Sequence, residues 1–539
     1  MLLLAAVLFA PHVLAQTPDA GFTATLGELR EATYADKAAI VERLSTSGHP
    51  SVRAVLSAFL DDRLYYRSSD QKIFIVKSTD DALPVWELVD PVTLKDSGSI
   101  APDGLTRIGT NNQLRRTIRT TVARFDLSSP DAGVRKAAVD EMINALDDAN
   151  LAALKARAGV ETNRGVRDEI DTGLALADLD GTNPNARLAA VKTLSGSLKP
   201  EARNRLETLT EKSSDGTFTE TDPRVREAAV AALRGIDRLR SIYGAIQTLF
   251  FGLSVGSVLV LVATGLAITF GVMGVINMAH GELMMLGAYT TYVVQQAMPN
   301  HIGASILVAI PAAFLVAGLA GVVLERTVIR FLYGRPLETL LATFGVSLIL
   351  QQLVRSIFSA NNRSVETPPW MSGTLEINPA LSITYNRLYI VIFTIIVFVS
   401  LLVLLKRTRL GLDIRAVAQN RPMAQAMGVR TQWVDAMTFG LGSGVAGMAG
   451  VALSQFTNVG PNLGQSYIVD SFMVVVFGGV GNLWGTLAGG MSMGIVNQLL
   501  EPYWGAVLAK IIVLVALILF IQRWPRGLFP QTGRAAESS

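Results

Sequence analysis

The sequence predicts a mostly α-helical protein: a polytopic helical membrane bundle of about eight or nine spans, preceded by an exported helical-repeat (HEAT-like) domain with a few short strands. Half of the 539 residues are hydrophobic and only 17% are charged, whereas soluble globular chains average about 25% charged residues. After residue 240, long apolar segments follow one another, each near the ~20 residues that cross the hydrocarbon core as a helix. Before residue 240 the chain is polar and contains an approximate internal repeat.

The first fifteen residues, MLLLAAVLFAPHVLA, have the pattern of a secretory signal peptide. The apolar run from Leu2 to Ala10 is too short to span a bilayer, and Val13-Leu14-Ala15 fits a small-x-small cleavage site. No Lys or Arg precedes this run, so an uncleaved anchor and a misassigned start remain alternatives. Cleavage would place the following region outside the cytoplasm. The predicted domains are a signal peptide (1–15), an extracytoplasmic repeat domain (16–238), a transmembrane domain (239–530) and a cytoplasmic tail (531–539).

The repeat consists of a Pro shortly before a Val-Arg or Ala-Arg pair and an apolar helical stripe. Its four copies begin at Pro50, Pro130, Pro184 and Pro223. Proline suits the first turn of a helix, and Ser129, Asn183 and Asp222 are suitable N-caps. Since one helix pair cannot bury its own apolar face, stacked HEAT-like pairs are expected. Residues 63–124 do not follow the proline–arginine repeat, and short strands are expected there near residues 63–66, 72–76 and 85–89.

Nine candidate spans follow, of which the seventh and eighth are short enough to form one broken element. They lie near residues 242–265, 268–296, 302–324, 337–358, 388–405, 432–455, 467–482, 484–500 and 505–521. Segments rich in Arg and Lys at 326–335, 406–430 and 523–526 are expected to face the cytoplasm. Counting back from them places residue 240 outside, in agreement with the signal peptide.

Several chemistries are excluded by residue types that the sequence lacks. No lysine follows a glycine, so the chain has no G-x-x-x-x-G-K-[ST] phosphate loop, and active transport would need an ion gradient or a separate ATPase. There is no cysteine, and the four histidines lack the close spacing of a helical metal site. We therefore expect neither a metal nor a cofactor, and no enzyme activity.

Asn277, His280 and Glu282 lie within a membrane-depth segment, GVMGVINMAHGE. Polar and charged groups at this depth usually face a cavity or a partner, and the glycines of the segment suit a helix break that could line a pathway. The three residues are candidates for the substrate pathway. The alternative is an interhelical hydrogen-bond cluster that only stabilises the bundle.

Gly442-Ser-Gly444-Val-Ala-Gly447 matches the G-x-G-x-x-G pattern of dinucleotide sites but lies inside an apolar span with no strand before it. Gly440, Gly444 and Gly447 instead form a ridge of small residues for close helix packing. Asp470 is interpreted as a helix-start acid near the outer surface.

The segment 411–428 could form two short helices, one through Ile414 and Ala418 and one from Pro422 to Gly428. Small and apolar residues flanked by arginines could dock into a groove on a partner protein. A solvated connecting loop is the alternative.

Four segments resemble the permease subunits of branched-chain amino acid type ABC importers. They are GVMGVINMAHGE (271–282), GLDIRAVAQNRPMAQAMGV (411–429), FGGVGNLWGTLAGG (477–490) and RWPRGLFP (523–530). Within this family, the long exported N-terminal extension resembles that of the urea-transport permeases.

The resemblance implies a multi-pass subunit of the bacterial inner membrane, with a periplasmic N-terminal domain and a cytoplasmic C-terminus. It implies three kinds of partner: a periplasmic solute-binding protein, a second homologous permease and two cytoplasmic ABC ATPases. The loop that couples the permease to the ATPases would contain Gly411, Arg415, Ala416, Gln419, Ala424 and Gly428. Importers often have the pattern E-A-A-x-x-x-G there, but this sequence has Pro422, Met423 and Ala424 and lacks the acidic residue.

The solute expected from the resemblance is urea, and the few ionisable residues deep in the bundle suit a neutral solute. A branched-chain amino acid or amide is the alternative. Two rival classes are an ATP-independent urea channel or transporter and a receptor whose repeat domain is anchored by the bundle.

Overall fold

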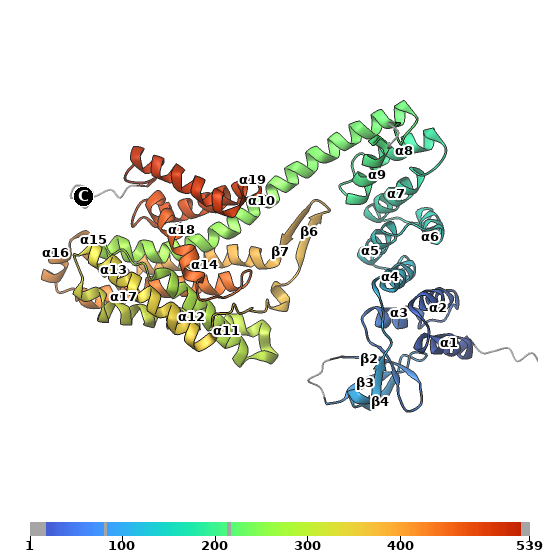
Figure 1. Cartoon of the computed structure of the whole chain (residues 1–539), viewed down its shortest axis with the longest axis horizontal. Coiled ribbons are helices and arrows are strands. Elements are labelled where there is room, and N and C mark those ends of the chain that lie inside the picture. The colour runs from blue at the N-terminus through green and yellow to red at the C-terminus, as the bar shows by residue number, and fades with distance from the viewer. Residues whose placement is uncertain (1–17, 80–83, 213–216, 530–539) are drawn as a thin grey trace, which may run out of the picture. The chain divides into compact units, whose positions relative to one another are not determined.

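The computed structural model describes residues 18–79, 84–212 and 217–529 (Figure 1). The predicted signal peptide (1–15) and tail (531–539) lie outside these residues. The chain divides into two compact units, Met1–Arg238 and Leu239–Ser539. Helix α10 (Pro223–Met273) contributes its first turns to the core of the first unit and its remainder to the second.

The first unit begins with helices and a small antiparallel sheet. Strands β1 to β3 lie where the sequence predicts them, whereas β4 and β5 were not predicted. The sheet order is β4-β3-β2-β1-β5. The elements are α1 (Pro18–Gly27), α2 (Tyr34–Thr46), α3 (Val52–Leu60), β1 (Leu64–Arg67), β2 (Ile73–Val76), β3 (Trp86–Val89), β4 (Asp96–Ile100) and β5 (Leu105–Arg107).

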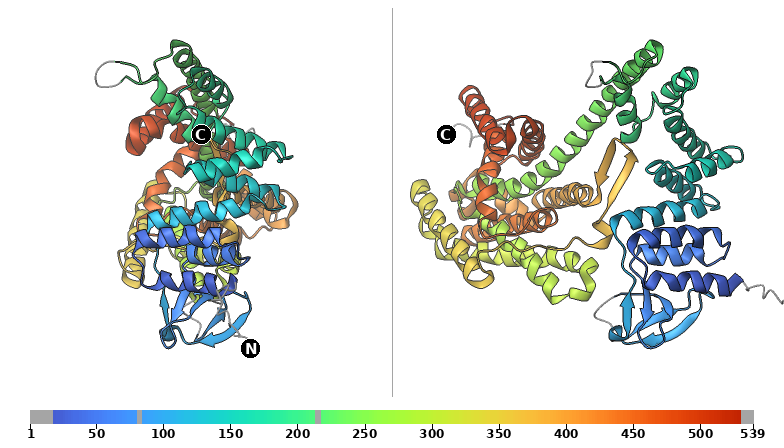
Figure 2. Two further views of the ribbon diagram at one scale, coloured as in Figure 1. Left: turned by 90° about the vertical axis from the view of Figure 1, so that its right-hand side faces the viewer. Right: turned by 45° about the vertical axis from the view of Figure 1, so that its right-hand side comes forward.

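Six further helices follow, and Figure 2 shows them side by side. Their apolar residues form one continuous core with the start of α10. These helices are α4 (Asn112–Asp126), α5 (Ala132–Ile143), α6 (Asp148–Ala158), α7 (Arg164–Asp178), α8 (Pro184–Leu194) and α9 (Pro200–Thr210). Helix α5 packs on α4 and α7, and α7 also packs on α6 and α8.

Two arginines of the sequence repeat join their helices to loops that lie between later helices of this region. Arg135 donates to both carboxylate oxygens of Glu161 at 2.8 and 2.9 Å, and Arg187 does the same to Glu220 at 2.8 Å. Bidentate pairs of this kind fix geometry as well as charge. In these two of the four copies, the arginine therefore ties its helix to a loop 26 or 33 residues further along the chain.

The predicted caps are partly right. Asn183 accepts a hydrogen bond from the amide of Asn185 at 2.9 Å, and Asp222 accepts one from Arg224 at 2.8 Å. Ser129 does not cap α5: Asp131, which lies one residue after Pro130, accepts from Gly133 instead. The helix begins later than the proline suggests because Asp131 supplies a better placed acceptor.

The second unit is a helical bundle. Among the described residues, six helices are long and apolar enough to cross a membrane: α10, α12, α13, α14, α17 and α19. α11 and α18 complete the bundle. The bounds are α11 (His280–Ala297), α12 (Ile302–Thr327), α13 (Pro336–Phe358), α14 (Tyr385–Arg407), α17 (Thr431–Ser454), α18 (Leu463–Gly478) and α19 (Leu483–Arg523).

The boundaries of two predicted spans differ from the structure. The predicted break at 266–267 is wrong, because α10 continues to Met273 and the chain leaves the helix only at Gly274, where φ is +64°. Helix α19 is kinked at Gly505 (φ 74°), three residues after Pro502, which separates the predicted segments 484–500 and 505–521. Positive φ favours glycine at both turns.

Helix α17 lies at the centre of the bundle. In the most apolar 18-residue stretch of α17, 89% of the residues are buried, whereas the corresponding figure for α19 is 17%. A Cβ atom added to Gly440 would lie 2.7 Å from Val322, one on Gly444 would lie 2.6 Å from Phe314, and one on Gly447 2.6 Å from the Ala313 oxygen. Because these positions have no side chain, α12 approaches the backbone of α17 directly.

The two ends of the bundle carry different connecting segments. At the first, which we name the hairpin end, strands β6 (Thr374–Asn378) and β7 (Leu381–Thr384) project from the bundle, and the backbone of Arg363 pairs with that of Val459. At the other, the α15/α16 end, lie the short helices α15 (Arg409–Gln419) and α16 (Arg421–Ala426).

We predict that Glu161→Gln destabilises the first unit. Hydrogen bonds from Arg135 hold the pKa of Glu161 well below its ordinary value. The folded-state pKa is therefore lower than the unfolded-state value of about 4.3, so the stabilisation is present above that pH and is lost as the pH falls through the folded-state pKa. Thermal unfolding of residues 18–238, followed by circular dichroism at pH 7, should show a Tm lowered by about 6 °C or more.

The matched control is Asp168→Asn, because Asp168 is exposed and 3.9 Å from Arg164, and it should change the Tm by about 1 °C or less. The difference in Tm between wild type and Glu161→Gln should shrink as the pH is lowered toward 3. Equal melting temperatures for the two variants at pH 7 would contradict a stabilising role for the Arg135–Glu161 pair.

Candidate functional site

The helix break at 274–279 places the three predicted pathway residues in the interior. Asn277 and His280 are fully buried, and Glu282 is 1% exposed. The Asn277 side chain accepts a hydrogen bond from the Ala279 amide at 3.0 Å and so turns the chain back into α11.

The structure separates these three residues rather than gathering them. His280 lies against α10, with Nε2 3.0 Å from the Val262 oxygen. Glu282 faces α13 and accepts hydrogen bonds from Ser347 at 3.1 Å and from Gln351 at 2.8 Å. Of the three, only Glu282 belongs to the polar contact between α11 and α13.

Helix α13 carries a polar stripe that the sequence analysis did not identify. Its members recur every fourth residue, the spacing that lines one face of a helix. Leu341, Leu348 and Ile349, on other faces, are exposed to the surroundings of the bundle. The four-residue spacing inside an apolar span could have revealed the stripe. Its residues are Thr339, Thr343, Ser347, Gln351 and Arg355.

The stripe meets α11 along a line that we name the α11/α13 seam: Glu282 and Tyr289 of α11 with Thr343, Ser347, Gln351 and Arg355 of α13. Thr343 also accepts from the amide of Met278 at 3.1 Å. Three buried polar atoms beside the seam have no hydrogen-bond partner among the described residues: Glu282 Oε2, the Tyr289 hydroxyl and Asn277 Nδ2. Buried groups of this kind are normally satisfied by water or a ligand.

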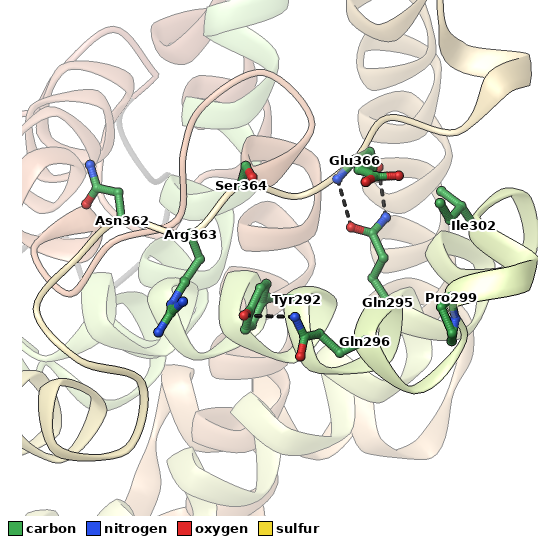
Figure 3. A pocket seen from close by; sticks show the side chains of 9 residues that line it. All are labelled: Tyr292, Gln295, Gln296, Pro299, Ile302, Asn362, Arg363, Ser364 and Glu366. Atoms are coloured by element: carbon green, nitrogen blue, oxygen red, sulfur yellow. Dashed lines mark hydrogen bonds between the residues drawn. The ribbon is translucent and has the colours of Figure 1, made fainter. Parts of the chain in front are cut away.

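At the hairpin end the seam leads toward a pocket of about 460 Å³ (Figure 3). Gln295 exchanges two hydrogen bonds with the Glu366 backbone at 2.9 and 2.7 Å, which holds the loop over the end of α11. Most of the lining is polar, which suits a hydrophilic solute. The lining residues are Tyr292, Gln295, Gln296, Pro299, Ile302, Asn362, Arg363, Ser364 and Glu366.

The predicted coupling segment forms the two short helices that the sequence indicates, α15 and α16. Gly411 and Ala424 are buried against the chain's own helices and Ala416 is half-buried, so these residues position the segment. Arg415 and Gln419 are exposed, and Arg415 also donates to the Leu405 oxygen. Gly428 ends the segment with φ +90°.

Three apolar side chains join the exposed face of this segment: Leu412, Met423 and Met427 are 59%, 60% and 78% exposed. These side chains, together with Arg415 and Gln419, we name the α15/α16 face. A solvated loop has no need of large apolar side chains on its surface, whereas a docking surface does.

An ion pair anchors this segment to the bundle. Arg421 donates to both carboxylate oxygens of Asp435 in α17 at 3.1 and 2.5 Å, and its guanidinium lies 4.1 Å from the Tyr333 ring centre. Glu325 of α12 is buried beside the same group. The sequence identified Arg421 only as a cytoplasmic positive charge, because its partner lies 14 residues away on another helix.

The interpretation of Asp470 as a helix-start acid is wrong. It lies in the middle of α18, is 5% exposed, and pairs with Lys510 of α19 at 2.8 Å. The Lys510 side chain is 48% exposed, whereas Asp470 is buried, and a buried carboxylate is stabilised by such a partner because hydrocarbon cannot solvate its charge.

Comparisons with known proteins agree on one family. The family model for "Branched-chain amino acid transport system / permease component" matches residues 248–521. LivH of Salmonella typhimurium, a high-affinity branched-chain amino acid transport system permease protein, is 31% identical over 294 residues, covering 52% of this chain and 94% of LivH.

Two further relatives are more distant. BraD of Pseudomonas aeruginosa, another high-affinity branched-chain amino acid transport system permease protein, is 28% identical over 297 residues, covering 53% of this chain and 96% of BraD. A probable branched-chain amino acid transport permease protein LivH of Methanocaldococcus jannaschii is 25% identical, covering 50% and 88%. No solved structure gives a significant match. The seam and the α15/α16 face lie within the residues that the family model matches.

We predict that Asp435→Asn loosens α15 and α16 from the bundle. Loss of the charge that holds Arg421 should raise the open population of this segment about fivefold, the effect of roughly 1 kcal/mol of local stability. Limited trypsin digestion of the detergent-solubilised chain should then cleave after Arg415 and Arg430 about fivefold faster. Asp413→Asn, in the same segment, is the control and should leave the rate unchanged. Identical digestion of both variants would show that Asp435 does not anchor the segment.

Proposed function

The chain belongs to the family of permease components of branched-chain amino acid transport systems, and we propose that it is the membrane-spanning subunit of an ABC importer for urea. The family and the six apolar helices make it a multi-pass membrane protein. Membership in the family implies, in general, separate ATPase subunits and a periplasmic solute-binding protein as partners. The full set in our proposal also contains a second homologous permease and two ATPases.

The α11/α13 seam carries this proposal. A solute that crosses the bundle needs hydrogen-bonding groups to replace its water, and the seam supplies them at successive depths between Thr343 and Arg355. Its unpartnered atoms at Glu282 and Tyr289 are free to bond to a passing molecule. Coupling to a motor would then open the seam toward one end of the bundle or the other.

Urea suits this seam because it is small and neutral, with four N–H donors and one carbonyl acceptor. The donors match the carboxylate of Glu282, and the carbonyl matches the Gln351 amide or the Tyr289 hydroxyl. The UrtB urea permeases, which the exported extension resembles, are the branch that fits this solute. A branched-chain amino acid is the second candidate, favoured by the similarity to LivH and BraD, which are permeases of branched-chain amino acid transport systems.

The α15/α16 face is the part of the chain that we propose for docking of the ATPases. Its exposed Leu412, Met423 and Met427 supply apolar contact area, and Arg415 supplies charge. The positive-inside rule supports a cytoplasmic location for the basic segments at this end of the bundle and a periplasmic one for the hairpin end. The signal-like pattern of the first fifteen residues supports a periplasmic first unit.

We further propose that helices α4 to α9 are HEAT-like repeats. Support comes from the packing of these helices around α7, their continuous core and the two arginine–glutamate pairs. A periplasmic repeat domain of this kind would offer an extended surface to a partner protein.

We predict that Gln351→Leu lowers urea uptake by the complete reconstituted set of subunits in liposomes. The variant removes a donor to Glu282 within the seam, so the rate of radiolabelled urea uptake should fall about tenfold. Gln352→Leu is the matched control, because Gln352 is the next residue in α13 and is exposed on another face. Equal uptake by the two variants would exclude the seam as the route.

We also predict that urea uptake requires ATP and the partner subunits. The variant Arg415→Glu should uncouple ATP hydrolysis from urea uptake. ATP hydrolysis should continue while urea uptake falls about tenfold or more, since a reversed charge on the docking face costs several kcal/mol. The amount of chain inserted in the membrane should not change. Urea uptake by the chain alone, without ATP, would favour the channel alternative, and normal coupling in Arg415→Glu would refute the assignment of the α15/α16 face.

A further inference from the structure

The guanidinium of Arg387 has no hydrogen-bond or ion-pair partner among the described residues, although it lies inside the hairpin end of the bundle. Its Nη1 atom is buried and unpartnered, and the side chain as a whole is half-buried, so solvent still reaches it. The ring centres of Phe251 and Phe456 lie 4.6 and 5.4 Å from the guanidinium carbon. Both rings are within cation–π distance and hold the side chain in place.

A second unpartnered group adjoins it. Gln455 is 4% exposed, and its Oε1 atom is buried without a partner in the part of the chain that the structure describes. Its backbone oxygen accepts a hydrogen bond from the Asn386 side chain at 3.4 Å, and Phe456, whose ring lies beside Arg387, is the next residue. The start of α14 and the chain that follows α17 are therefore in contact here through two neighbours of these residues, with Asn386 bonded to the Gln455 backbone and Phe456 beside the Arg387 guanidinium.

Arg387 and Gln455 have the chemistry of a binding site for a small polar ligand. An arginine has five N–H donors and no acceptor, and a buried donor such as the Arg387 Nη1 group is unfavourable without a partner. A ligand that carries a carbonyl or carboxylate oxygen next to N–H groups would satisfy both: its oxygen would accept from Arg387 and its N–H would donate to Gln455. Tyr467 of α18 lies close enough to interact electrostatically with Arg387 and borders the same region.

We infer that Arg387 and Gln455, framed by Phe251 and Phe456, bind the transported solute at the hairpin end through an oxygen acceptor and an adjacent N–H donor. The inference rests on the proposed transport function and deepens it by naming the solute contact. Urea and an α-amino acid both have this chemistry. Gln455 also lines an apolar cavity of about 180 Å³ with Ile390 and Phe393, so an aliphatic side chain has space nearby and both solutes must be tested.

The test uses the full chain reconstituted with its partner subunits, with radiolabelled urea and radiolabelled leucine as separate probes. Arg387→Met keeps the length of the side chain but removes its donors, and should lower uptake about tenfold or more. ATP hydrolysis should stay within about twofold of wild type, because the contact is to the solute and not to the ATPases. Arg387→Lys should recover part of the uptake, and more of it for leucine, whose carboxylate gains from a charged donor.

Gln455→Met should lower uptake as well, and the double variant should lose less than the product of the two single losses, because both residues hold one molecule. Arg330→Met is the control: its guanidinium lies 4.9 Å from the Phe331 ring centre but is exposed, and uptake should be unchanged. Wild-type uptake in Arg387→Met would overturn the inference. A parallel loss of uptake and hydrolysis would give Arg387 a structural role and also overturn it. If the wild-type set transports neither probe, the proposed function itself fails.

Discussion

Hydrocarbon offers no hydrogen bonds, and this constraint explains why the buried polar side chains of the bundle lie opposite partners on other helices. The stripe on α13 turns inward because its outer face meets lipid, and Glu282 is the group that α11 presents to it. Asp470 and Lys510 follow the same rule between α18 and α19. Several buried polar groups of the bundle are therefore paired between helices, and the atoms left without a partner beside the seam are the places where a solute could bond.

The position of Glu282 depends in turn on close helix packing and on the break before α11. Glycines in α17 let α11 and α12 approach its backbone, since a Cβ at Gly287 would meet Gly447 and one at Gly444 would meet Phe314. The positive φ of Gly274 lets the chain leave α10 inside the bundle, and the Asn277 side chain closes the turn. Substituted glycines would push α11 away from α17 and change its contact with α13.

The ends of the bundle have different chemistry, which suits different tasks. At the α15/α16 end, Arg421 fixes a short helical segment to α17 and leaves an apolar face exposed. At the hairpin end, polar groups line a pocket, and the Arg387 guanidinium lies near two aromatic rings with a buried donor that has no partner in the described part of the chain. A transporter that receives solute on one side and mechanical work on the other needs this asymmetry.

Composition and spacing along the sequence determined the membrane character, most helices, three strands, the two short helices of residues 411–428 and the glycines of α17, because those features depend on neighbouring residues. Tertiary structure decided the partners: Glu282 with Ser347 and Gln351, Arg421 with Asp435, Asp470 with Lys510. It also separated His280 from Glu282, two residues apart in sequence, by turning one toward α10 and the other toward α13. Side chains joined across 14 to 69 residues follow from helix packing, which local periodicity does not specify.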